Sequence, residues 1–439
     1  MMKMMFHPRL PVEDKYQVIV LGGGPSGCAA AAAAAREGAT TLLIEQTGAL
    51  GGMGTSGLVP TWGPFTDQVR VIYRGLAEYI FNRSRKQLPH VPATQLAWVP
   101  IDSEKLKTIY DELMAEHHVD VLFHSMMADV ICNETTVTAV VVANKAGLTA
   151  YRAPVFIDCT GDVDVVARTG VKFQQGTDAS GELQPMTHCF KLANVDMAVY
   201  SRIDFGSLAP ESLIVKIVHD DQFPLLIDSH RCNAVTGPGV VTFNSGHLFR
   251  IDATDPVALS RAMIQGRQIA AQFHAALRKY APEAFGNSVL AATAPLMGVR
   301  ETRRIIGDYI FTVDDYMHRR SFPDEICRNS YFLDVHRNVA GNSKSIGDCV
   351  PNDYGPGESH GIPYRCLVPK ALANVLVAGR GISTDRDVNS SIRIMPACLV
   401  TGEAAGVAGG MAALSGVGIH DLNTTVLRDN LRRHGAYLP

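Results

Sequence analysis

Apolar residues near the start of the chain follow the order strand, tight turn, helix, strand. Tyr16–Leu21 is a continuous apolar run, which predicts a parallel strand buried on both faces. An alanine-rich helix is expected after it, up to about Glu37, and Gly38 supplies its stop. Ala39–Glu45 then predicts a second buried strand. This segment therefore indicates a unit of a parallel α/β sheet.

The pattern of apolar residues divides the remainder of the chain into three parts. A capped amphipathic helix (Asp102 or Ser103 as the cap) is predicted over 102–117, with strands over Val119–Phe123, Val137–Ala143 and 149–158. The middle, about 176–350, mixes strand-like segments with one long helix over 256–280, which suits a cap over a substrate site. The last part predicts a strand over Val375–Ala378 and a helix of small residues over 396–414, the same pattern of buried strand and small-residue helix as in the first segment.

Composition narrows the class of protein. Of 439 residues, 46% are apolar and 19% charged, which favours a compact fold with a large interior. The net charge of −3 gives no reason to expect nucleic acid or an anionic membrane as a partner. The apolar stretch Cys28–Ala35 is too short to cross a bilayer, and the N-terminus lacks the apolar core of a secretory signal. We expect a soluble, cytoplasmic protein.

The cysteines argue against a cluster or a zinc knuckle. There are nine, and no two lie closer than Cys349 and Cys366, which are 17 residues apart. Without a CxxC pair, an iron–sulfur or structural zinc site is not expected, and we predict no metal.

The first chemical motif is the glycine-rich turn between the first strand and the first helix. Gly22 permits a tight turn, Gly24 lets the backbone approach a pyrophosphate, and Gly27 allows the helix to pack on the sheet. The helix start presents free N–H groups and a positive dipole end to the phosphates. Glu45, at the end of the second strand, is placed to accept hydrogen bonds from a ribose. Together these features predict a dinucleotide site.

Two further segments extend this site. Gly51–Gly57 (GGMGTSG) is glycine-rich enough to let main chain lie against a large flat ligand. Phe156–Asp162 (FIDCTGD) is an apolar strand that stops at Thr160-Gly161, where the chain can turn beside the adenosine half of a dinucleotide.

The C-terminal segment carries the most information. The strand ending at Gly379-Arg380 leads to Ser390–Pro396 (SSIRIMP), where the proline marks the start of a helix. A helix start beside a flavin stabilises the negative charge that the ring gains on reduction. The small residues that follow permit close helix packing.

On these segments the chain resembles the FAD-dependent oxidoreductase family, the FAD_oxidored group of the glutathione-reductase-like flavoproteins. IVLGGGPSGCAAAAAAAREG, GGMGTSG, FIDCTGD, GVRETRRIIGD and GIPYRCLVPKALANVLVAGRGIS…SIRIMPACLVTGEAAG carry the resemblance. It implies FAD lying extended between the N-terminal turn and the C-terminal helix, with the middle region over the isoalloxazine. The wider superfamily commonly has Gly-Asp where this chain has Gly379-Arg380, so Arg380 is expected to contact phosphate or a flavin edge. No histidine lies in 45–60, which favours non-covalent FAD.

The predicted fold is thus α/β, a Rossmann-like FAD-binding (GR2-type) domain with an inserted α+β substrate or cap domain. Residues 1–175 and 351–439 form the FAD-binding domain, and 176–350 form the cap. The predicted cofactor-binding residues are Gly22, Gly24, Pro25, Ser26, Gly27, Glu45, Gln46, Gly51, Gly52, Met53, Ser56, Gly57, Val130, Thr160, Gly161, Asp162, Arg304, Gly379, Arg380, Ser390, Arg393 and Met395.

Candidates for the chemistry come from loops expected near the flavin. Arg300, Arg303 and Arg304 would share one face if GVRETRRIIGD were helical, and they could bind an anionic substrate or the FAD pyrophosphate. A histidine is the natural proton carrier near neutral pH. The predicted catalytic residues are His188, His336 and Tyr364.

Three functions are compatible with these motifs. The first is a dehydrogenase or reductase that transfers a hydride between a small organic substrate and non-covalent FAD. The others are a flavin monooxygenase, and a flavoprotein subunit whose chemistry depends on a partner. No second strand–GxGxxG–helix unit exists, so the expected redox partner is a protein, a quinone, oxygen, or a nicotinamide that visits the same pocket. Substrate, reaction direction and oligomeric state stay open at this point.

Overall fold

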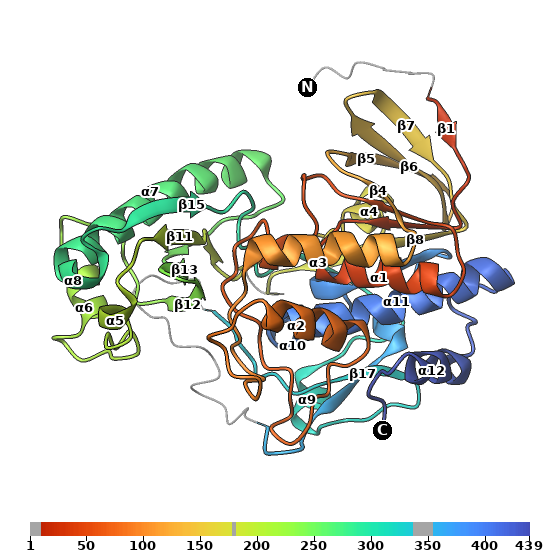
Figure 1. Ribbon diagram of the computed structural model, residues 1–439. Helices are drawn as coiled ribbons and strands as arrows, with labels where there is room; N and C mark the ends of the chain where they lie inside the picture. Colours follow the sequence, from red (N-terminus) through yellow and green to blue (C-terminus); the bar gives the residue numbers. More distant parts are fainter. Residues whose placement is uncertain (1–9, 178–180, 337–353) are drawn as a thin grey trace.

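The computed structural model describes residues 10–177, 181–336 and 354–439. A larger lobe, the main body, holds both ends of the described chain, and a smaller lobe, the cap, projects from its side (Figure 1). We define the cap as residues 186–299, whose apolar side chains form a core of their own.

A five-stranded parallel sheet organises the main body. Its order is β19 (Val375–Val377), β8 (Val155–Asp158), β2 (Val18–Leu21), β3 (Thr41–Ile44) and β4 (Asp120–Leu122). Every residue of the four strands from β19 to β3 is buried. The apolar runs that predicted parallel strands buried on both faces are therefore confirmed.

Helices α1 (Pro25–Arg36) and α11 (Met395–Ser415) pack against each other at close range. A Cβ added at Gly402 would lie 2.2 Å from the carbonyl oxygen of Ser26, and one at Gly406 would lie 2.2 Å from that of Ala30. The backbones approach so closely that only glycine fits at these two positions. The predicted close packing by small residues is confirmed.

Helix α11 is also the only helix of the described residues that is long and apolar enough to cross a membrane. However, 83% of its most apolar window is buried inside the protein. Its place in the core therefore accounts for its composition.

Of the two predicted caps, Asp102 is the one that caps α3 (Ser103–Glu116), because its side chain accepts from the amides of Glu104 and Lys105. One prediction for the main body differs from the structure. The single strand expected over 149–158 is two strands, β7 (Gly147–Tyr151) and β8, which belong to different sheets. Pro154 lies in the break and has no amide hydrogen for a continuous ladder.

The other elements of the main body support this frame. A second sheet has the order β1 (Val12–Glu13), β7, β6 (Thr136–Asn144), β5 (Met126–Asn133). The remaining elements are η1 (Gly52–Gly54), α2 (Leu76–Lys86), α4 (Asp164–Arg168), β9 (Phe173–Gln175), β16 (Arg303–Ile305), α9 (Val313–Met317), β17 (Glu325–Asn329), β18 (His360–Pro363), η3 (Tyr364–Cys366), η4 (Gly379–Gly381), α10 (Arg386–Ile392) and α12 (Thr424–Arg433).

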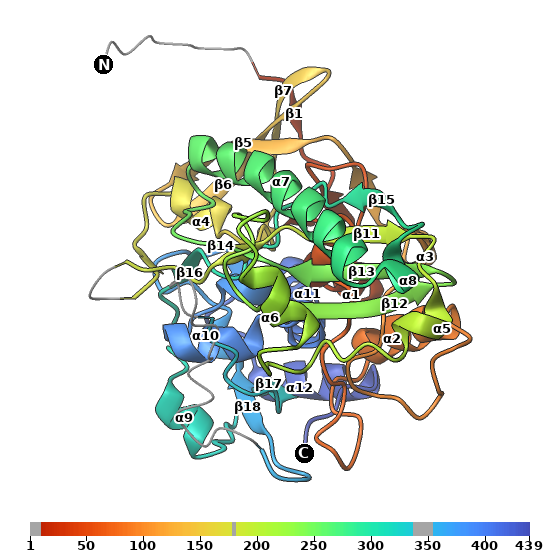
Figure 2. The same ribbon diagram turned by 90° about the vertical axis from the view of Figure 1, so that its left-hand side faces the viewer.

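The cap is an antiparallel sheet with one long helix across it. The sheet order is β12 (Arg231–Gly237), β13 (Val240–Ser245), β11 (Phe190–Ala193), β15 (Val289–Thr293). Helix α7 (Pro256–Tyr280), predicted over 256–280, lies across one face of this sheet (Figure 2). Short elements complete the cap: β10 (Met186–Thr187), α5 (Met197–Tyr200), α6 (Leu213–Val218), β14 (His247–Leu248) and α8 (Pro282–Phe285).

Among the described residues, the cap covers less of the chain than the predicted 176–350, of which 178–180 and 337–350 lie outside the described residues. Its buried core lies between Met186 and Met297, whereas Ile305, Phe311 and Tyr316 pack into the cores of the main body. The chain after residue 300 returns to the main body because β16 pairs with β9, and β17 with β18.

Candidate functional site

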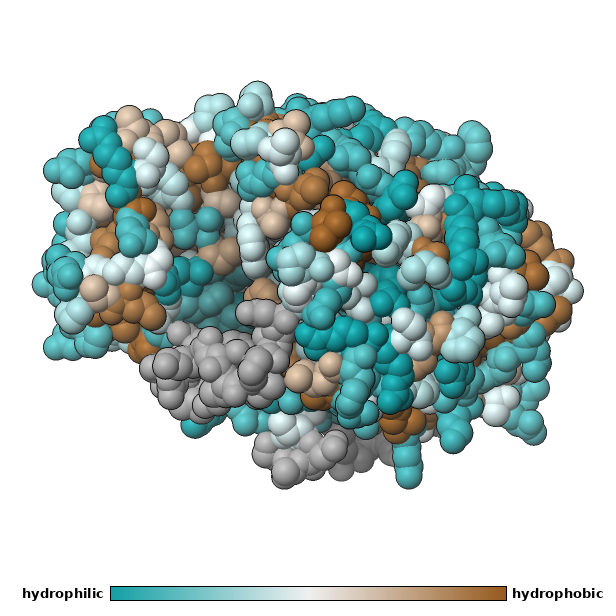
Figure 3. Space-filling view, turned by 90° about the horizontal axis from the view of Figure 1, so that it is seen from below, coloured by the Kyte–Doolittle hydropathy of each residue, from teal (hydrophilic) through white to brown (hydrophobic). Residues whose placement is uncertain are grey.

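A cavity of about 440 Å³ lies between the main body and the cap. It begins at the turn after β2, passes the start of α11, and ends under the cap sheet. On the face shown in Figure 3 the surface is hollowed between the two lobes. Such a position, at the carboxyl ends of parallel strands, is the usual ligand site of an open α/β sheet.

The three glycines of the first motif have separate tasks. A Cβ at Gly22 (φ +93°) would lie 2.6 Å from the carbonyl oxygen of Cys159, and one at Gly27 would lie 1.8 Å from that of Gly22. These two glycines therefore let the turn pack. A Cβ at Gly24 would meet no protein atom within 4 Å, and Gly24 lines the cavity. The backbone at Gly24 is thus open to a ligand.

Two helix starts open onto this one cavity without a side-chain cap. The N-cap of α1 is Gly24 and that of α11 is Ile394, and neither offers a side chain to the free amides of the first turn. Ser26 at one start and Met395 at the other both line the cavity. Unpaired amides and the positive dipole ends make both places suitable for the negative parts of a nucleotide.

Glu45 holds the turn together as well as facing the cavity. Its Oε2 accepts from the amide of Gly23 at 2.6 Å, and its Oε1 accepts from the amide of Thr47 at 2.7 Å. Each carboxylate oxygen accepts more than one hydrogen bond, so Glu45 can also accept from a ribose hydroxyl. Gln46 lines the cavity beside it.

Arg380 forms an ion pair with Asp162, the last residue of the segment Phe156–Asp162. Its Nη2 lies 2.7 Å from Oδ1 of Asp162, which also accepts from the hydroxyl of Thr302 at 2.6 Å. Gly161 (φ +81°) leaves room for the guanidinium, since a Cβ there would lie 2.5 Å from Nη1 of Arg380. Nε of Arg380 is buried without a hydrogen-bond partner among the described residues, and other atoms of Arg380 line the cavity.

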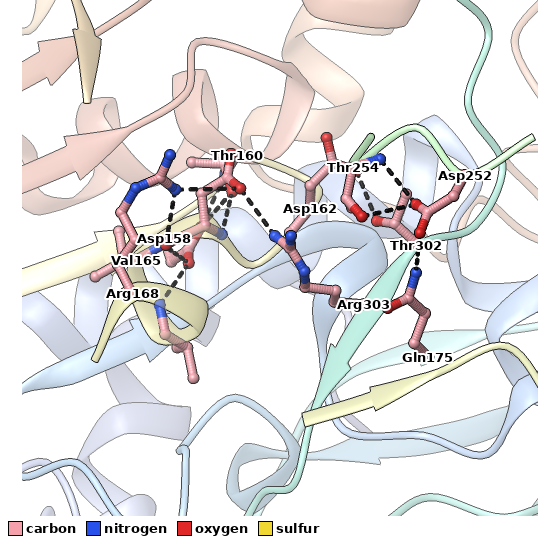
Figure 4. A network of polar contacts seen from close by, with 12 residues as sticks. Asp158, Thr160, Asp162, Val165, Arg168, Gln175, Asp252, Thr254, Thr302 and Arg303 are labelled. Carbon is pink, nitrogen blue, oxygen red and sulfur yellow. Dashed lines mark hydrogen bonds and ion pairs between the residues drawn. The ribbon is translucent and has the colours of Figure 1, made fainter. Parts of the chain in front are cut away.

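The same network secures the end of β8. Asp158 accepts from the amide of Val165 and from the hydroxyl of Thr160, and burial raises its pKa to about 6. Figure 4 shows this network continuing through Asp162 and Thr302. A further hydrogen bond, from Nε2 of Gln175 to Asp252 at 2.8 Å, connects strand β9 of the main body to the cap.

One face of the cap sheet forms the roof of the cavity. Cys232 on β12 pairs with Asn244 on β13, and both line the cavity together with Cys189. Burial raises the pKa of the Cys189 thiol to about 12, so this thiol stays protonated near neutral pH.

Arg300 is a buried cation at the cap end of the cavity. It is 7% exposed and donates to the carbonyl oxygen of Pro185 at 2.8 Å, to Oγ1 of Thr187 at 2.8 Å, and to Nε2 of His230 at 3.1 Å. No carboxylate of the described residues forms an ion pair with it. Burial, followed by repulsion from Arg393, lowers its pKa to about 10, which leaves it charged at neutral pH.

Asp334 joins the groups around Arg300. It lies 3.1 Å from Nη2 of Arg393 and 3.2 Å from Nε2 of His336. Burial raises the pKa of Asp334, but His336 and Arg393 together outweigh it and hold that pKa below its usual range. Burial and the charge of Arg300 lower the pKa of His336 to about 4.

Most of the predicted site residues face this cavity. Of the predicted catalytic residues, His336 alone lines it. Of the predicted cofactor residues, those that line it are Gly22, Gly24, Pro25, Ser26, Glu45, Gln46, Gly52, Met53, Thr160, Gly161, Asp162, Arg380, Arg393 and Met395.

The other predicted cofactor residues lie behind the wall of the cavity and act in packing. Ser56 accepts at its carbonyl oxygen from the amide of Leu296 in the cap, and the hydroxyl of Ser390 donates to the carbonyl oxygen of Asp387. Val130 packs on β5 against the core. The residues in this group are Gly27, Gly51, Ser56, Gly57, Val130, Arg304, Gly379 and Ser390.

The arginine segment needs a correction. GVRETRRIIGD is not helical, since only Arg303–Ile305 is regular and forms strand β16. Arg303 and Arg304 therefore point to opposite sides. Arg304 is buried in an ion pair with Glu301 at 2.7 Å, which removes it from the cofactor set. Arg300 alone of the three lines the cavity.

Two of the predicted catalytic residues are also corrected. Nε2 of His188 lies 2.7 Å from the carbonyl oxygen of Ala294, and the ring is buried behind the roof. The hydroxyl of Tyr364 donates to the carbonyl oxygen of Ile419 at 2.8 Å in the main core. Neither lines the cavity, so neither is placed to touch a ligand there.

Three residues at the cap end were not predicted. His230 and His247 stack within the cap, whereas Asp334 belongs to the main body, where it contacts Arg393 and His336. No spacing or local motif connects them in the sequence. The chain has fifteen histidines, and nothing in the sequence distinguishes His230 and His247 from the others.

Comparison with known proteins agrees with the geometry of the cavity. The family model described as FAD dependent oxidoreductase matches residues 17–431, which is nearly the whole chain. No curated protein matches it.

Solved structures match the chain at low identity. A geranylgeranyl bacteriochlorophyll reductase-like protein from Thermoplasma acidophilum is 13% identical, with a TM-score of 0.45 over 96% of this chain and 83% of its own. CabE, an aromatic hydroxylase from angucycline biosynthesis, is 12% identical, with a TM-score of 0.45 over 95% of this chain and 65% of its own. A triple mutant of the flavin-dependent brominase Bmp2 is 13% identical, with a TM-score of 0.44 over 95% and 84%.

Proposed function

Because the chain belongs to the FAD-dependent oxidoreductase family, we propose that it is a dehydrogenase or reductase that transfers a hydride between FAD and a small anionic organic substrate. FAD is the cofactor, and it supplies the redox chemistry when bound. The task of the chain is to bind it, to orient the substrate and to control charge and water around both.

The cavity fits an elongated dinucleotide at its main-body end. The open backbone at Gly24, the free amides of α1 and the carboxylate of Glu45 would hold the pyrophosphate and adenosine side. The uncapped start of α11, with Arg393 beside it, would hold the part of FAD that gains negative charge on reduction.

Arg300 is the observation that supports an anionic substrate. A buried guanidinium without a carboxylate partner among the described residues is costly unless an anion accompanies it. Arg300 lines the cavity at the cap end, away from the first glycine motif, and a carboxylate there would complete its hydrogen bonds. A planar guanidinium binds a carboxylate through two parallel bonds, which also orients the substrate.

An anaerobic screen tests this function. Small hydroxy, amino and unsaturated carboxylic acids are mixed without oxygen with the FAD-loaded protein, and each acid is paired with its methyl ester as a neutral control. An acid that bleaches the flavin while its ester does not supports the proposal. If only neutral compounds bleach the flavin, the substrate is not an anion. Turnover of a substrate only when oxygen is present would show a monooxygenase.

Arg300→Met separates substrate binding from cofactor binding. The variant should keep its FAD. Its affinity for the acid that bleaches wild type should fall by about 100-fold, since truncating one partner of a buried charge pair costs about 2–5 kcal/mol. Arg267→Met, at an exposed arginine of the cap helix, is the matched control and should behave as wild type. If Arg300→Met bleaches at the wild-type rate and affinity, Arg300 does not bind the substrate.

A further inference from the structure

Three imidazoles gather at the cap end of the cavity, where His230 and His336 line it and the ring of His247 lies against both. The rings of His230 and His247 stack with centroids 4.1 Å apart, and the ring of His336 meets them edge-on at 5.0 and 5.1 Å. One ring nitrogen from each lies within 4.8 Å of the other two. Two of these histidines belong to the cap and one to the main body, so the cluster lies where the lobes meet.

From this juxtaposition we propose that His230, His247 and His336 bind a divalent transition-metal ion, with zinc or iron(II) as the chemical class. Imidazole nitrogens suit both ions. Three protein ligands with a fourth, open position are the arrangement of catalytic rather than structural sites. The proposal goes beyond the expectation of no metal, which considered only the spacing of cysteines.

His247 provides a second, independent indication. Its side chain is 2% exposed, and its Nε2 has no hydrogen-bond partner among the described residues. Its Nδ1 lies 3.2 Å from Oδ1 of Asp228, which also accepts from the amide of His247. A carboxylate that holds one ring nitrogen so that the other is free is the usual support of a metal-binding histidine. An unpaired buried nitrogen is costly unless a ligand satisfies it.

Acidic side chains balance the cationic groups around the three rings. Asp228 and Asp334 contact His247 and His336, and their two negative charges offset Arg300 and Arg393. The site is thus not cationic before an ion enters.

Only a small adjustment is needed for coordination. Metal–nitrogen bonds of about 2.0–2.1 Å in a tetrahedral site place the nitrogens about 3.4 Å apart, compared with separations up to 4.8 Å here. Arg300 donates to Nε2 of His230 at 3.1 Å, and a neutral imidazole has a single lone pair, so an ion would take this nitrogen in place of Arg300, which keeps its bonds to Pro185 and Thr187. The open position would then face the cavity next to Arg300, where the ion could contact a substrate oxygen.

Metal titration of the FAD-loaded protein tests the site. The protein is treated with a chelator, checked for unchanged flavin content, and titrated with Zn²⁺ by calorimetry, with bound zinc counted by mass spectrometry. Co²⁺ is added in parallel, because its tetrahedral absorption bands lie at longer wavelength than those of flavin. One ion per chain, with the intense cobalt spectrum of a nitrogen-rich site, is expected.

Variants identify the ligands. His247→Gln and His336→Gln should each lose tight binding, and Asp228→Asn, at a positioning residue, should bind about 10–100-fold more weakly while keeping one ion per chain at saturation. His274→Gln, at a cap histidine bound to Ser288, is the matched control, and Cys232→Ser tests whether a cavity thiol is the ligand instead. Both should bind as wild type.

Two outcomes would overturn the site. Wild-type protein that takes up neither Zn²⁺ nor Co²⁺ at one ion per chain excludes it, whatever the variants do. Equal binding by wild type, His247→Gln and His336→Gln excludes these histidines. Neither result depends on the proposed function, because no substrate is present in the titration.

Discussion

The two ends of the cavity bind by different means. At the main-body end, the groups placed to bind a ligand belong mostly to the backbone. They are the open Gly24, the uncapped starts of α1 and α11, and the turn whose amides Glu45 holds. At the cap end the functional groups are side chains, with Arg300, the three histidines and Asp334 drawn from segments far apart in the chain. Backbone binding leaves continuous motifs in a sequence, whereas side-chain binding at a lobe interface leaves none.

This difference predicts that each end can be damaged without the other.

Gly24→Val should remove FAD and leave the fold intact. A Cβ at Gly24 meets no protein atom within 4 Å, so the side chain is tolerated but occupies the approach of the pyrophosphate. We expect FAD binding at least about 100-fold weaker, or about 2.7 kcal/mol, measured from flavin absorbance and titration. The matched change Gly27→Ala should instead unfold the protein, because its Cβ would lie 1.8 Å from a backbone oxygen. If Gly24→Val retains FAD with wild-type affinity, backbone approach is not the basis of binding.

Gly402→Ala should destabilise the main body. The new methyl group would lie 2.2 Å from the carbonyl oxygen of Ser26, so α1 and α11 must separate. The expected loss is about 2–3 kcal/mol of the free energy of unfolding, measured by urea denaturation. Gly410→Ala lies on the same helix but its Cβ would be 3.0 Å from a side-chain atom of Glu37, so its cost should be within about 1 kcal/mol. Equal losses for both variants would mean that close backbone contact is not what holds the two helices.

His360 should make the main body sensitive to acid. It is buried among Phe311, Tyr316 and Tyr354, and burial, then Arg328 and Arg319, lower its pKa to about 3. Between pH 6.5 and 3 the unfolded chain binds a proton at this residue and the folded chain does not, so stability falls as pH falls through that window. Between pH 7 and 5 the loss should be about 2 kcal/mol.

The measurement compares wild type with His360→Gln in urea at pH 7 and pH 5. The variant should be less stable at pH 7 but lose less on acidification, because the titrating ring is gone. Parallel losses in the two proteins would show that His360 does not set the acid response.

Glu45→Gln should weaken FAD binding only modestly. The amide keeps one acceptor for the amides of Gly23 and Thr47 but presents a donor to the other, so the turn loses one charge-assisted hydrogen bond. An increase of about 10-fold in the Kd of FAD is expected, equal to about 1.4 kcal/mol. Asp14→Asn, at an exposed carboxylate, serves as the control and should leave the Kd unchanged.

Much of the main body was predictable because its interactions are local in sequence or repeat with the period of a regular element. The apolar runs Tyr16–Leu21 and Val375–Ala378 predicted two strands of the central sheet, and the glycine spacing from Gly22 to Gly27 predicted the turn. The two errors there have different causes. Pro154, a local feature, divided one expected strand, whereas Arg303–Ile305 became a strand because it pairs with β9, which is remote in sequence.

Side-chain chemistry was less predictable. Of the predicted catalytic residues His188, His336 and Tyr364, only His336 lines the cavity. A histidine or tyrosine in a loop has the same local sequence signature whether it faces a core carbonyl group or a ligand. His188 and Tyr364 found carbonyl partners in the interior, and no periodicity distinguishes that outcome in advance.

The sequence by itself determined the parallel sheet, the glycine turn and the family, because strand burial and backbone turns depend on short runs of residues and on what glycine alone permits. Which arginine lacks a carboxylate partner among the described residues, and which histidines meet, is set by tertiary structure. These contacts join separate elements of the cap and the main body, and such contacts leave no pattern within any one segment.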